Sequence, residues 1–511
     1  MKKKLNKETI IKELFQYGYL NEAIPDCFNS NDFALNYTKL MNDVRKVIRT
    51  SSCTIDIYKN EAERRTISLP NPYAFTHTVK FIKNNFSKIR ENAESENSQS
   101  PIVRIHGYDN DVYSINSGGF LRSLKRNSKF THNLMERIKY SLGYKYLLKV
   151  DIANFYETIY THSLAWAVCG KEESKQMCYN SIAKSDLYIF ADNFDKSMRN
   201  QSANETNGII TGPFTSRIFS EIILSKIDEQ LRQKNLHFKR YVDDYRFYFR
   251  DKNEAMCSLT NISNIFAEFK LKINNSKVEI LCYPFELDHS VPMKLQQAFK
   301  NFGAYGLLVE AGELWNQGIK SSYKYSFKIL QDKELPKEDF SILLSLLFNI
   351  QLLDPSYSIY ICNIISTNIN YLDLGQIEEN VNCLLAQCLN KEFNHEALNF
   401  LFLAKEFDIN IETSNIYKSL KTNNDFITII ALDIWKNHKS KVIEDNLTEY
   451  SEIEQQINFL TERMTKESVD GEHWLLLYQS KLLNLLNITE FNGSTEKFFN
   501  HMLDLNISFY R

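Results

Sequence analysis

The sequence lacks the features that mark secreted, disulfide-linked and membrane-spanning proteins. Its nine cysteines are scattered and form no Cys-x-x-Cys pair, so neither a zinc site nor a disulfide framework is indicated. Residues 1–12 are charged and carry no apolar core of the kind found in a signal peptide. The longest apolar run, 340–353, is interrupted by polar residues and is too short to span a bilayer. We therefore expect a cytoplasmic protein with no membrane partner.

Length and charge indicate two parts with different partners. A chain of 511 residues is too long for one hydrophobic core, so two or three domains are expected. Residues 1–300 hold 44 Lys and Arg against 34 Asp and Glu, a balance of +10, and the remaining residues hold 17 against 29, a balance of −12. A polyanion is therefore expected to bind the first half, and the acidic second half is not expected to wrap DNA.

The pattern of apolar residues changes near residue 302. Residues 1–60 are predicted to be mainly helical, 63–69 to be a strand ended by two prolines, and 91–100 to be a mobile polar loop. Residues 116–129 are basic and fit either a phosphate-binding or a solvated helix face. Beyond 302, short polar links separate predicted helices at Leu307–Leu330, Asp339–Leu353, Ser356–Thr367, Gln376–Leu389, Glu396–Phe407, Phe426–His438, Ser451–Thr465 and Trp474–Leu486. This succession, with no strict repeat, is typical of an α-solenoid or an irregular bundle.

Two adjacent aspartates, Asp243 and Asp244, stand between the β-forming segments 237–242 and 245–249. This pattern predicts a β-hairpin with the acidic pair at its turn. Two like charges in a tight turn repel each other unless a cation or hydrogen bonds offset them, and carboxylate oxygens suit Mg²⁺. An isolated Asp-Asp pair is by default a solvated turn. Other segments of the chain therefore have to indicate whether this pair binds a metal ion.

Three further segments are candidates for the same site. Asp151 ends a predicted strand, 144–150, where it fits either a metal ligand or a helix N-cap. The loop 207–216 contains Gly212, which lets backbone approach a ligand, although a plain turn is the default. Pro213 fits the first position of the helix that follows, and 271–280 is predicted to be a turn flanked by strands.

In chain order, these segments resemble the motifs of the reverse transcriptase family. Arg65, Ile67 and Pro70 match the fingers motif R-x-I-x-x-P, and DIANFYETIYTHSL from Asp151 is similar to the first palm motif of retron and group II intron enzymes. GIITGPFTS at 208–216 resembles the dNTP-contacting loop, YVDD at 241–244 the catalytic box, and 271–277 the next palm motif with its lysine. The resemblance covers about residues 60–285. It implies an α+β fold with fingers and palm over residues 1–300, followed by an all-α (HEAT-like or solenoid) domain over residues 301–511.

The resemblance also implies two-metal nucleotidyl transfer of dNTPs. Asp151 and Asp243 are expected to bridge two Mg²⁺ ions, for which Mn²⁺ can substitute, with Asp244 assisting and the backbone carbonyl of Ile152 as a further ligand. The substrate-binding candidates are Arg65 and Lys277 at the pyrophosphate, Tyr156 as the steric gate under the sugar, and Thr211 and Gly212 at the base and sugar. Phe155 is expected in the core.

Departures from the family pattern point to one branch of it. Ile210, Thr211 and Arg217 stand where a templated enzyme usually has Pro, Gln and Pro, which puts template dependence in doubt. A palm followed by a long helical region resembles the abortive-infection (AbiK-like) reverse transcriptases of bacterial phage defence. That resemblance implies untemplated synthesis primed from a tyrosine hydroxyl, a single-stranded DNA product attached to the protein, a homo-oligomer, and a phage or host trigger protein. Tyr17, Tyr19 and Tyr37 are N-terminal candidates for priming, and the sequence does not choose among the 28 tyrosines.

Two alternatives stay open. In the first alternative, the chain is a templated RNA-directed DNA polymerase resembling retron or intron enzymes. In the second, its helical half is a partner-binding scaffold with a vestigial palm. The clustered charge of Asp151, Asp243 and Asp244 argues against the scaffold, because a vestigial site has no reason to keep it.

Overall fold

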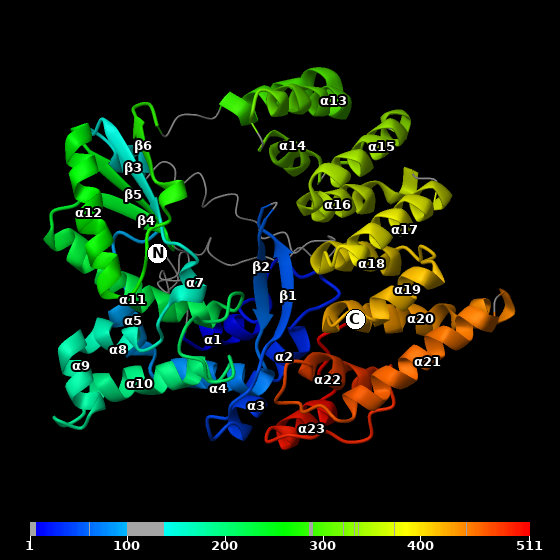
Figure 1. The fold of residues 1–511 in the computed structure, drawn as a ribbon, viewed down its shortest axis with the longest axis horizontal. Helices are drawn as coiled ribbons and strands as arrows, with labels where there is room; N and C mark the ends of the chain where they lie inside the picture. Colours follow the sequence, from blue (N-terminus) through cyan, green and yellow to red (C-terminus); the bar gives the residue numbers. More distant parts are fainter. Residues whose placement is uncertain are drawn as a thin grey trace.

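The computed structural model describes residues 7–60, 62–99, 137–285, 290–319, 321–331, 333–335, 337–371, 374–445 and 447–511 (Figure 1). The basic segment 116–129 lies outside these residues. Among the described helices, none combines the length and the apolarity that crossing a bilayer requires.

The N-terminal region joins short helices to a two-stranded ribbon. Its elements are α1 (Lys7–Gln16), α2 (Asn31–Leu35), α3 (Tyr37–Asp43), β1 (Cys53–Tyr58), β2 (Arg64–Leu69), α4 (Pro72–Asn84) and α5 (Phe86–Ala93). β1 and β2 pair antiparallel from Cys53 opposite Leu69 to Tyr58 opposite Arg64. The prediction of a mainly helical segment 1–60 is therefore wrong at its end, where alternating β-formers in the sequence CTIDIY make a strand.

The second region is a four-stranded antiparallel sheet covered on one face by helices. Its elements are β3 (Tyr146–Asp151), α7 (Phe155–Thr158), α8 (Ser163–Cys169), α9 (Lys171–Cys178), α10 (Asp186–Arg199), α11 (Phe214–Gln233), β4 (Phe238–Tyr241), β5 (Asp244–Phe249), α12 (Lys252–Glu268), the 3₁₀ turn η1 (Asn275–Lys277) and β6 (Glu279–Cys282). The strand order is β4-β5-β3-β6. Tyr245 and Phe247 point to the covered face, where the Tyr245 ring lies 5.2 Å from that of Phe266 in α12. The predicted hairpin around the acidic pair is confirmed.

The polar segment 91–99 does not form the mobile loop that its composition predicts. Ser95, Asn97, Ser98 and Gln99 are buried, and they run along the outer edge of β4. The backbone N–H of Arg240 donates to Asn97 O at 3.0 Å, and that of Gln99 donates to Arg240 O at 2.8 Å. The prediction is wrong because short polar side chains can be buried when each finds a hydrogen-bond partner.

The rest of the chain is helical. Its elements are α13 (Ser290–Asn316), α14 (Ser322–Leu330), α15 (Lys337–Leu353), η2 (Pro355–Tyr357), α16 (Ser358–Asn368), η3 (Ile369–Tyr371), α17 (Leu374–Asn390), α18 (Asn394–Glu406), α19 (Thr413–Leu420), α20 (Asp425–Asp445), α21 (Leu447–Met464), α22 (Trp474–Leu483) and α23 (Glu496–Asp504). The predicted helix 307–330 is two helices, because Gly318, with a φ of 93°, follows the end of α13. The helices α19 and α23 were not predicted. Successive helices contact neighbours one or two places along the chain, as in a solenoid; HEAT-like repeats stay a prediction.

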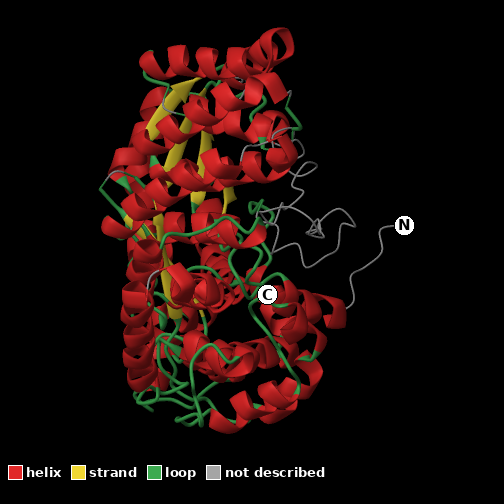
Figure 2. Cartoon of the chain, turned by 90° about the vertical axis from the view of Figure 1, so that its right-hand side faces the viewer, coloured by secondary structure: helices red, strands yellow, loops and turns green. Residues whose placement is uncertain are grey.

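The helical region packs against the N-terminal one (Figures 1 and 2). The rings of Phe28 and Phe426 lie 4.9 Å apart, and Arg64 in β2 pairs with buried Glu396 in α18 at 2.5 Å. The C-terminal residues return to the first helices, where the N–H of Arg511 donates to Cys27 O at 2.9 Å. Although the change in pattern near residue 300 is real, the hydrophobic core is continuous across it, and the division at that residue stays a prediction.

Candidate active site

The three predicted aspartates meet at one end of the four-stranded sheet. Asp151, the last residue of β3, lies directly opposite Asp244, the first residue of β5. Asp243 occupies the hairpin turn next to it, after Val242, whose φ of 55° places a β-branched residue in the left-handed region. The short turn and the strand register therefore bring together carboxylates that lie some ninety residues apart in the chain.

A cavity of about 430 Å³ lies over these carboxylates. It is lined by Asn21, Glu22, Ala23, Ile57, Lys59, Arg65, Ile67, Asp151, Ile152, Asn154, Phe155, Tyr156, Glu157, Thr211, Gly212, Pro213, Arg217, Asp243, Asp244, Asn274 and Lys277. All nine residues predicted for metal and substrate binding are in this set. The wall opposite the aspartates comes from β1, β2 and the loop before α11, so the cavity lies between the two sheets.

The carboxylates are crowded and only partly balanced by cations. Burial, together with the charges of Asp244 and Asp151, raises the pKa of Asp243 to about 7. Burial and a hydrogen bond with Asp151 raise the pKa of Asp244. Lys277 Nζ lies 2.9 Å from Asp151 Oδ2, and this contact raises the pKa of Lys277. We call Asp151, Asp243, Asp244 and Lys277 the front cluster.

The opposite wall depends on a close backbone contact. The N–H of Ser68 in β2 donates to Thr211 O at 2.7 Å. A Cβ atom on Gly212 would lie 2.7 Å from Ser68 O, and the φ of Gly212 is 137°, so a residue without a side chain is required. Pro213 is the N-cap of α11 and not, as predicted, its first helical residue. Arg65 projects from β2 as an exposed side chain of the cavity wall.

The short helix α7 supplies the floor of the cavity. Phe155 is 3% exposed, which confirms its expected place in the core. Tyr156 is turned toward the cavity, and burial raises the pKa of its hydroxyl. Lys59 Nζ donates to Asn154 Oδ1 at 3.2 Å and so links the end of β1 to the start of α7.

None of the three tyrosines named as priming candidates, Tyr17, Tyr19 and Tyr37, lines this cavity. Tyr19 is fully buried and its hydroxyl donates to Pro70 O at 2.7 Å, which gives it a structural role. The hydroxyl of Tyr37 donates to Glu8. Among the described residues that line the cavity, the sole tyrosine is Tyr156.

The sequence did not predict a second charged cluster directly behind the turn. Arg240, Glu221 and Asp228, at most 1% exposed, form this rear cluster. The guanidinium of Arg240 donates to both oxygens of Asp228 at 2.8 and 2.9 Å and to both oxygens of Glu221 at 2.8 and 3.0 Å. Its Nη1 also donates to Val242 O at 3.2 Å, so it holds the strained turn from behind. A usable signal was the spacing of Glu221 and Asp228, two helical turns apart on the apolar side of α11.

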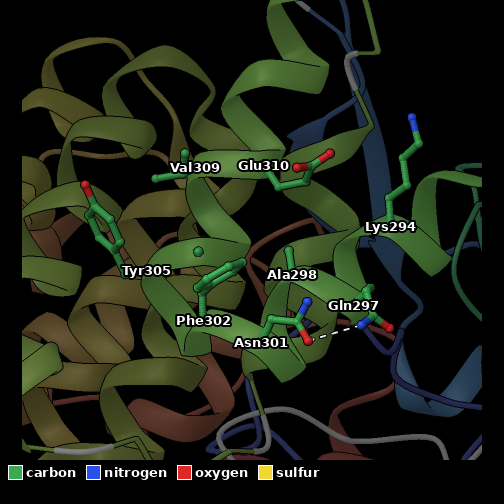
Figure 3. Close-up of a pocket in the computed structure, with 9 residues that line it drawn as sticks. Lys294, Gln297, Ala298, Asn301, Phe302, Tyr305, Val309 and Glu310 are labelled. Atoms are coloured by element: carbon green, nitrogen blue, oxygen red, sulfur yellow. Dashed lines mark hydrogen bonds between the residues drawn. The ribbon is translucent and has the colours of Figure 1, made fainter.

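Another hollow, of about 580 Å³, lies on the surface of α13 and contains none of the predicted residues (Figure 3). Phe302 is 73% exposed there, and Gln297 donates to Asn301 Oδ1 at 3.1 Å. Neutral and apolar groups make up most of its wall, so it offers no set of ligands for metal or phosphate.

The fold and the cavity define a nucleotidyltransferase: clustered carboxylates at a hairpin turn, faced by cations across a nucleotide-sized space. The chain belongs to the reverse transcriptase family, because the family model described as reverse transcriptase (RNA-dependent DNA polymerase) matches residues 59–330, more than half of the chain. The resemblance read from the motifs is therefore confirmed for the family, while the abortive-infection branch stays a prediction.

Solved structures of telomerase are among the matches. Apo telomerase from Candida tropicalis has a TM-score of 0.28 and 14% identity, covering 88% of this chain and 78% of that chain. Its form truncated from the C-terminal domain has a TM-score of 0.26 and 15% identity, covering 45% of this chain and 50% of that chain. At these TM-scores the likeness carries no argument about template or substrate. The comparison with curated proteins found no match.

Proposed function

We propose that this chain is a DNA polymerase that adds dNTPs to a hydroxyl by two-metal nucleotidyl transfer. The observation that carries the proposal is the convergence of Asp151, Asp243, Asp244, Arg65 and Lys277 on one cavity with a glycine-dependent wall. Family membership supports nucleotides and nucleic acid as the ligands.

The donor set fits divalent cations. Among the described residues, no group of three or more His, Cys, Asp or Glu side chains is arranged so that it could hold a metal ion. Mg²⁺, however, is commonly held by one or two carboxylates and otherwise by water and substrate phosphates. Asp151, Asp243 and the Ile152 carbonyl would hold the ions, with Asp244 beside them. Bound there, such ions activate an attacking hydroxyl and neutralise charge on the phosphates.

The remaining residues would orient the nucleotide. Lys277 has a side chain 56% exposed, so it can exchange its contact with Asp151 for a phosphate oxygen. Arg65 would bind the leaving pyrophosphate from the opposite wall, as cationic clamps do in phosphoryl transfer. Thr211 and Gly212 would contact the base and sugar, and Tyr156 would exclude a 2′-hydroxyl.

We further propose that synthesis is untemplated and primed by a tyrosine of the protein, in antiphage defence of the abortive-infection kind. Ile210, Thr211 and Arg217 support this, because they replace residues that usually hold a templating base pair, and Thr211 and Arg217 line the cavity. A homo-oligomer and a phage or host trigger protein belong to the same proposal. The second candidate is templated synthesis, which the description of the matching family model favours.

One incorporation assay separates the candidates. Purified chain receives Mg²⁺ and labelled dNTPs with no nucleic acid, and Asp243→Asn is the matched control. Label that stays with the protein through denaturation, and is released only by protease or nuclease, supports untemplated protein-primed synthesis. Incorporation that begins only after primer and RNA template are added supports templated synthesis. Absence of incorporation in both arms favours the scaffold and overturns the polymerase proposal.

A further inference from the structure

The first turn of α18 contacts two segments of the cavity wall from outside. Because a carbonyl oxygen can only accept, the Nε2 of His395 donates to Ala23 O, at 2.7 Å. The next residue, Glu396, pairs with Arg64 in β2 at 2.5 Å. Ala23 lines the cavity, and so does Arg65, the neighbour of Arg64. None of the described residues of α18 lines the cavity, so two adjacent residues of the helical region hold its wall without reaching the ligand space.

The ribbon of β1 and β2 lies between the cavity and α18, which packs against β1 (Figure 1). Side chains alternate across a strand, so Arg65 and Ile67 share one face, and Ile57 shares it because it pairs with Arg65. All three residues line the cavity. Arg64 lies on the other face, toward α18. Its pair with Glu396 therefore acts on the back of the strand that presents Arg65 to the cavity.

The ribbon depends on the helical region for a fixed position. Two paired strands alone are marginally stable, so packing against another element has to hold them. At one end of the ribbon, the guanidinium of Arg64 lies 4.8 Å from the centre of the Phe393 ring and pairs with Glu396, whose side chain is excluded from water. At the other end, Asn424 Nδ2 donates to Thr54 O at 3.1 Å. The helical region thus anchors the ribbon at both ends.

The loop of residues 21–23 is anchored by the neighbouring residue of the same helix. The N–H of Ala23 donates to Asn21 Oδ1 at 2.9 Å in an Asx turn, and both residues line the cavity. His395 is buried, and burial lowers the pKa of its imidazole, which favours the neutral ring with its proton on Nε2. A shift of α18 would therefore move this loop and the ribbon together.

We propose that His395 and Glu396 are positioning residues, through which α18 holds the ribbon and the loop 21–23 at the distance from the aspartates that a nucleotide requires. The inference rests on the proposed function, because it takes the cavity as the nucleotide site. The aspartates belong to the other sheet and its hairpin turn. Loss of either contact should therefore weaken the binding of nucleotide and leave the binding of metal ions nearly unchanged.

Binding of a nucleotide without synthesis tests the proposal. The probe is a fluorescent dATP with a methylene group in place of the α,β-bridging oxygen, which blocks transfer, and anisotropy in Mg²⁺ measures its Kd for the full chain. Glu396→Gln and His395→Leu are each expected to raise this Kd, and the KM for dATP, about threefold to tenfold, because displaced wall residues no longer meet the nucleotide together. The Mg²⁺ concentration that gives half of the thermal stabilisation without nucleotide should stay within about twofold of the native value.

Three further variants separate positioning from stability. His395→Gln places an amide N–H near the place of the imidazole N–H and should restore the native Kd within about twofold. Asp195→Asn removes a buried carboxylate that pairs with Arg199 at 3.1 Å, as Glu396 pairs with Arg64, but outside the cavity, so the Kd should stay native. The double variant Arg64→Met with Glu396→Leu leaves no buried charge without its partner, so its stability should stay near the native value while the Kd is still raised.

The outcomes separate this inference from the proposed function. A raised Kd in Glu396→Gln, His395→Leu and the double variant, with a native Kd in His395→Gln and Asp195→Asn, supports the role of α18. A native Kd in the first three variants, an equal loss in Asp195→Asn, or no binding of the analogue by the native chain overturns it. Failure of the proposed function would appear differently, as absent incorporation of dNTPs by a native chain that binds the analogue.

Discussion

Two charged clusters built from similar side chains lie on either side of the hairpin turn at Val242 and Asp243. In the rear cluster, each nitrogen of the Arg240 guanidinium donates to at least one acceptor, and the three side chains are excluded from water. In the front cluster, three carboxylates share one ammonium, that of Lys277, which is 56% exposed. Carboxylates that are buried and paired with a guanidinium are held in a fixed geometry. Carboxylates that are partly exposed and lack enough cations can instead bind a positively charged ligand. The difference indicates a structural role for the rear cluster and supports the proposal that the front cluster binds the metal ions and the substrate.

The largest expected effect comes from breaking the front cluster. Asp243→Asn keeps the shape of the side chain and removes a carboxylate, so we expect incorporation of dNTPs to fall by about a thousandfold or more. Incorporation under saturating Mg²⁺ is the measurement, with circular dichroism and thermal unfolding to show that the fold is kept. Synthesis at the native rate by this variant would contradict the assignment of the site.

Breaking the rear cluster should affect stability instead. Arg240→Met leaves Glu221 and Asp228 buried without their cation, and we expect the free energy of unfolding to fall by about 3–5 kcal/mol. Burial raises the pKa of both carboxyls, so without Arg240 they should take up protons, and the loss should be smaller at pH 5 than at pH 8. Denaturant unfolding at the two pH values measures this.

The control for Arg240 is an exposed arginine with one partner. Arg232→Met removes the pair between Arg232 and Glu96, whose side chains are 39% and 75% exposed. Its unfolding free energy should change by no more than about 0.5 kcal/mol. Equal losses in Arg240→Met and Arg232→Met would contradict the structural role of the rear cluster.

The sequence predicted which residues meet at the cavity, because local patterns encode their positions, while their roles stay predictions. The β-forming residues on both sides of the acidic pair predict the hairpin around Asp243. The position of Asp151 at the end of a predicted strand makes it a candidate metal ligand. Gly212 was found from its loop, and the structure adds the reason: Ser68 O leaves no room for a Cβ atom. Each of these signals lies within about ten consecutive residues.

The rear cluster, the burial of polar side chains within residues 94–99 and the strand β1 were missed because long-range contacts create them. Glu221 and Asp228 lie on a helix, whereas their partner Arg240 lies on a strand 19 and 12 residues further along the chain. Residues 94–99 read as a loop until β4 supplies hydrogen bonds for their backbone. The strand β1 reads as an extension of a helical region until β2 pairs with it. Where the partner of a residue lies far along the chain, composition alone predicts that the residue is exposed to solvent.

Protonation should couple to metal binding in the front cluster. The pKa of Asp243 in the folded chain is about 7, against about 3.9 in an unfolded chain. Between these values the folded state holds a proton that the unfolded state has lost, so this residue makes stability fall as pH rises from about 4 to about 7. A divalent cation needs the carboxylate form, so binding it below pH 7 releases this proton.

The affinity for Mg²⁺ should therefore weaken about tenfold for each pH unit below 7 and level off above it. Thermal unfolding with increasing Mg²⁺ at pH 6 and pH 8 gives the two midpoints. In Asp243→Asn the pH dependence should be much reduced, and the metal-free variant should be more stable than the native chain at pH 8. A midpoint independent of pH in the native chain would contradict the raised pKa.

The smallest expected effect tests whether residues 94–99 belong to the rear cluster. The Ser95 hydroxyl donates to Asp228 Oδ2 at 2.6 Å in a buried site, whereas the Ser225 hydroxyl donates to Glu94 O at 2.9 Å in an exposed one. Ser95→Ala should reduce the free energy of unfolding by about 1–2 kcal/mol, because the bond is to a buried charge, and Ser225→Ala by about 0.5 kcal/mol or less. Both variants delete one hydroxyl near the same segment, so their difference in denaturant midpoint isolates the contribution of the buried carboxylate. Equal midpoints would show that the Ser95 hydroxyl adds nothing to the hydrogen bonds that Asp228 accepts from Arg240 and Tyr245.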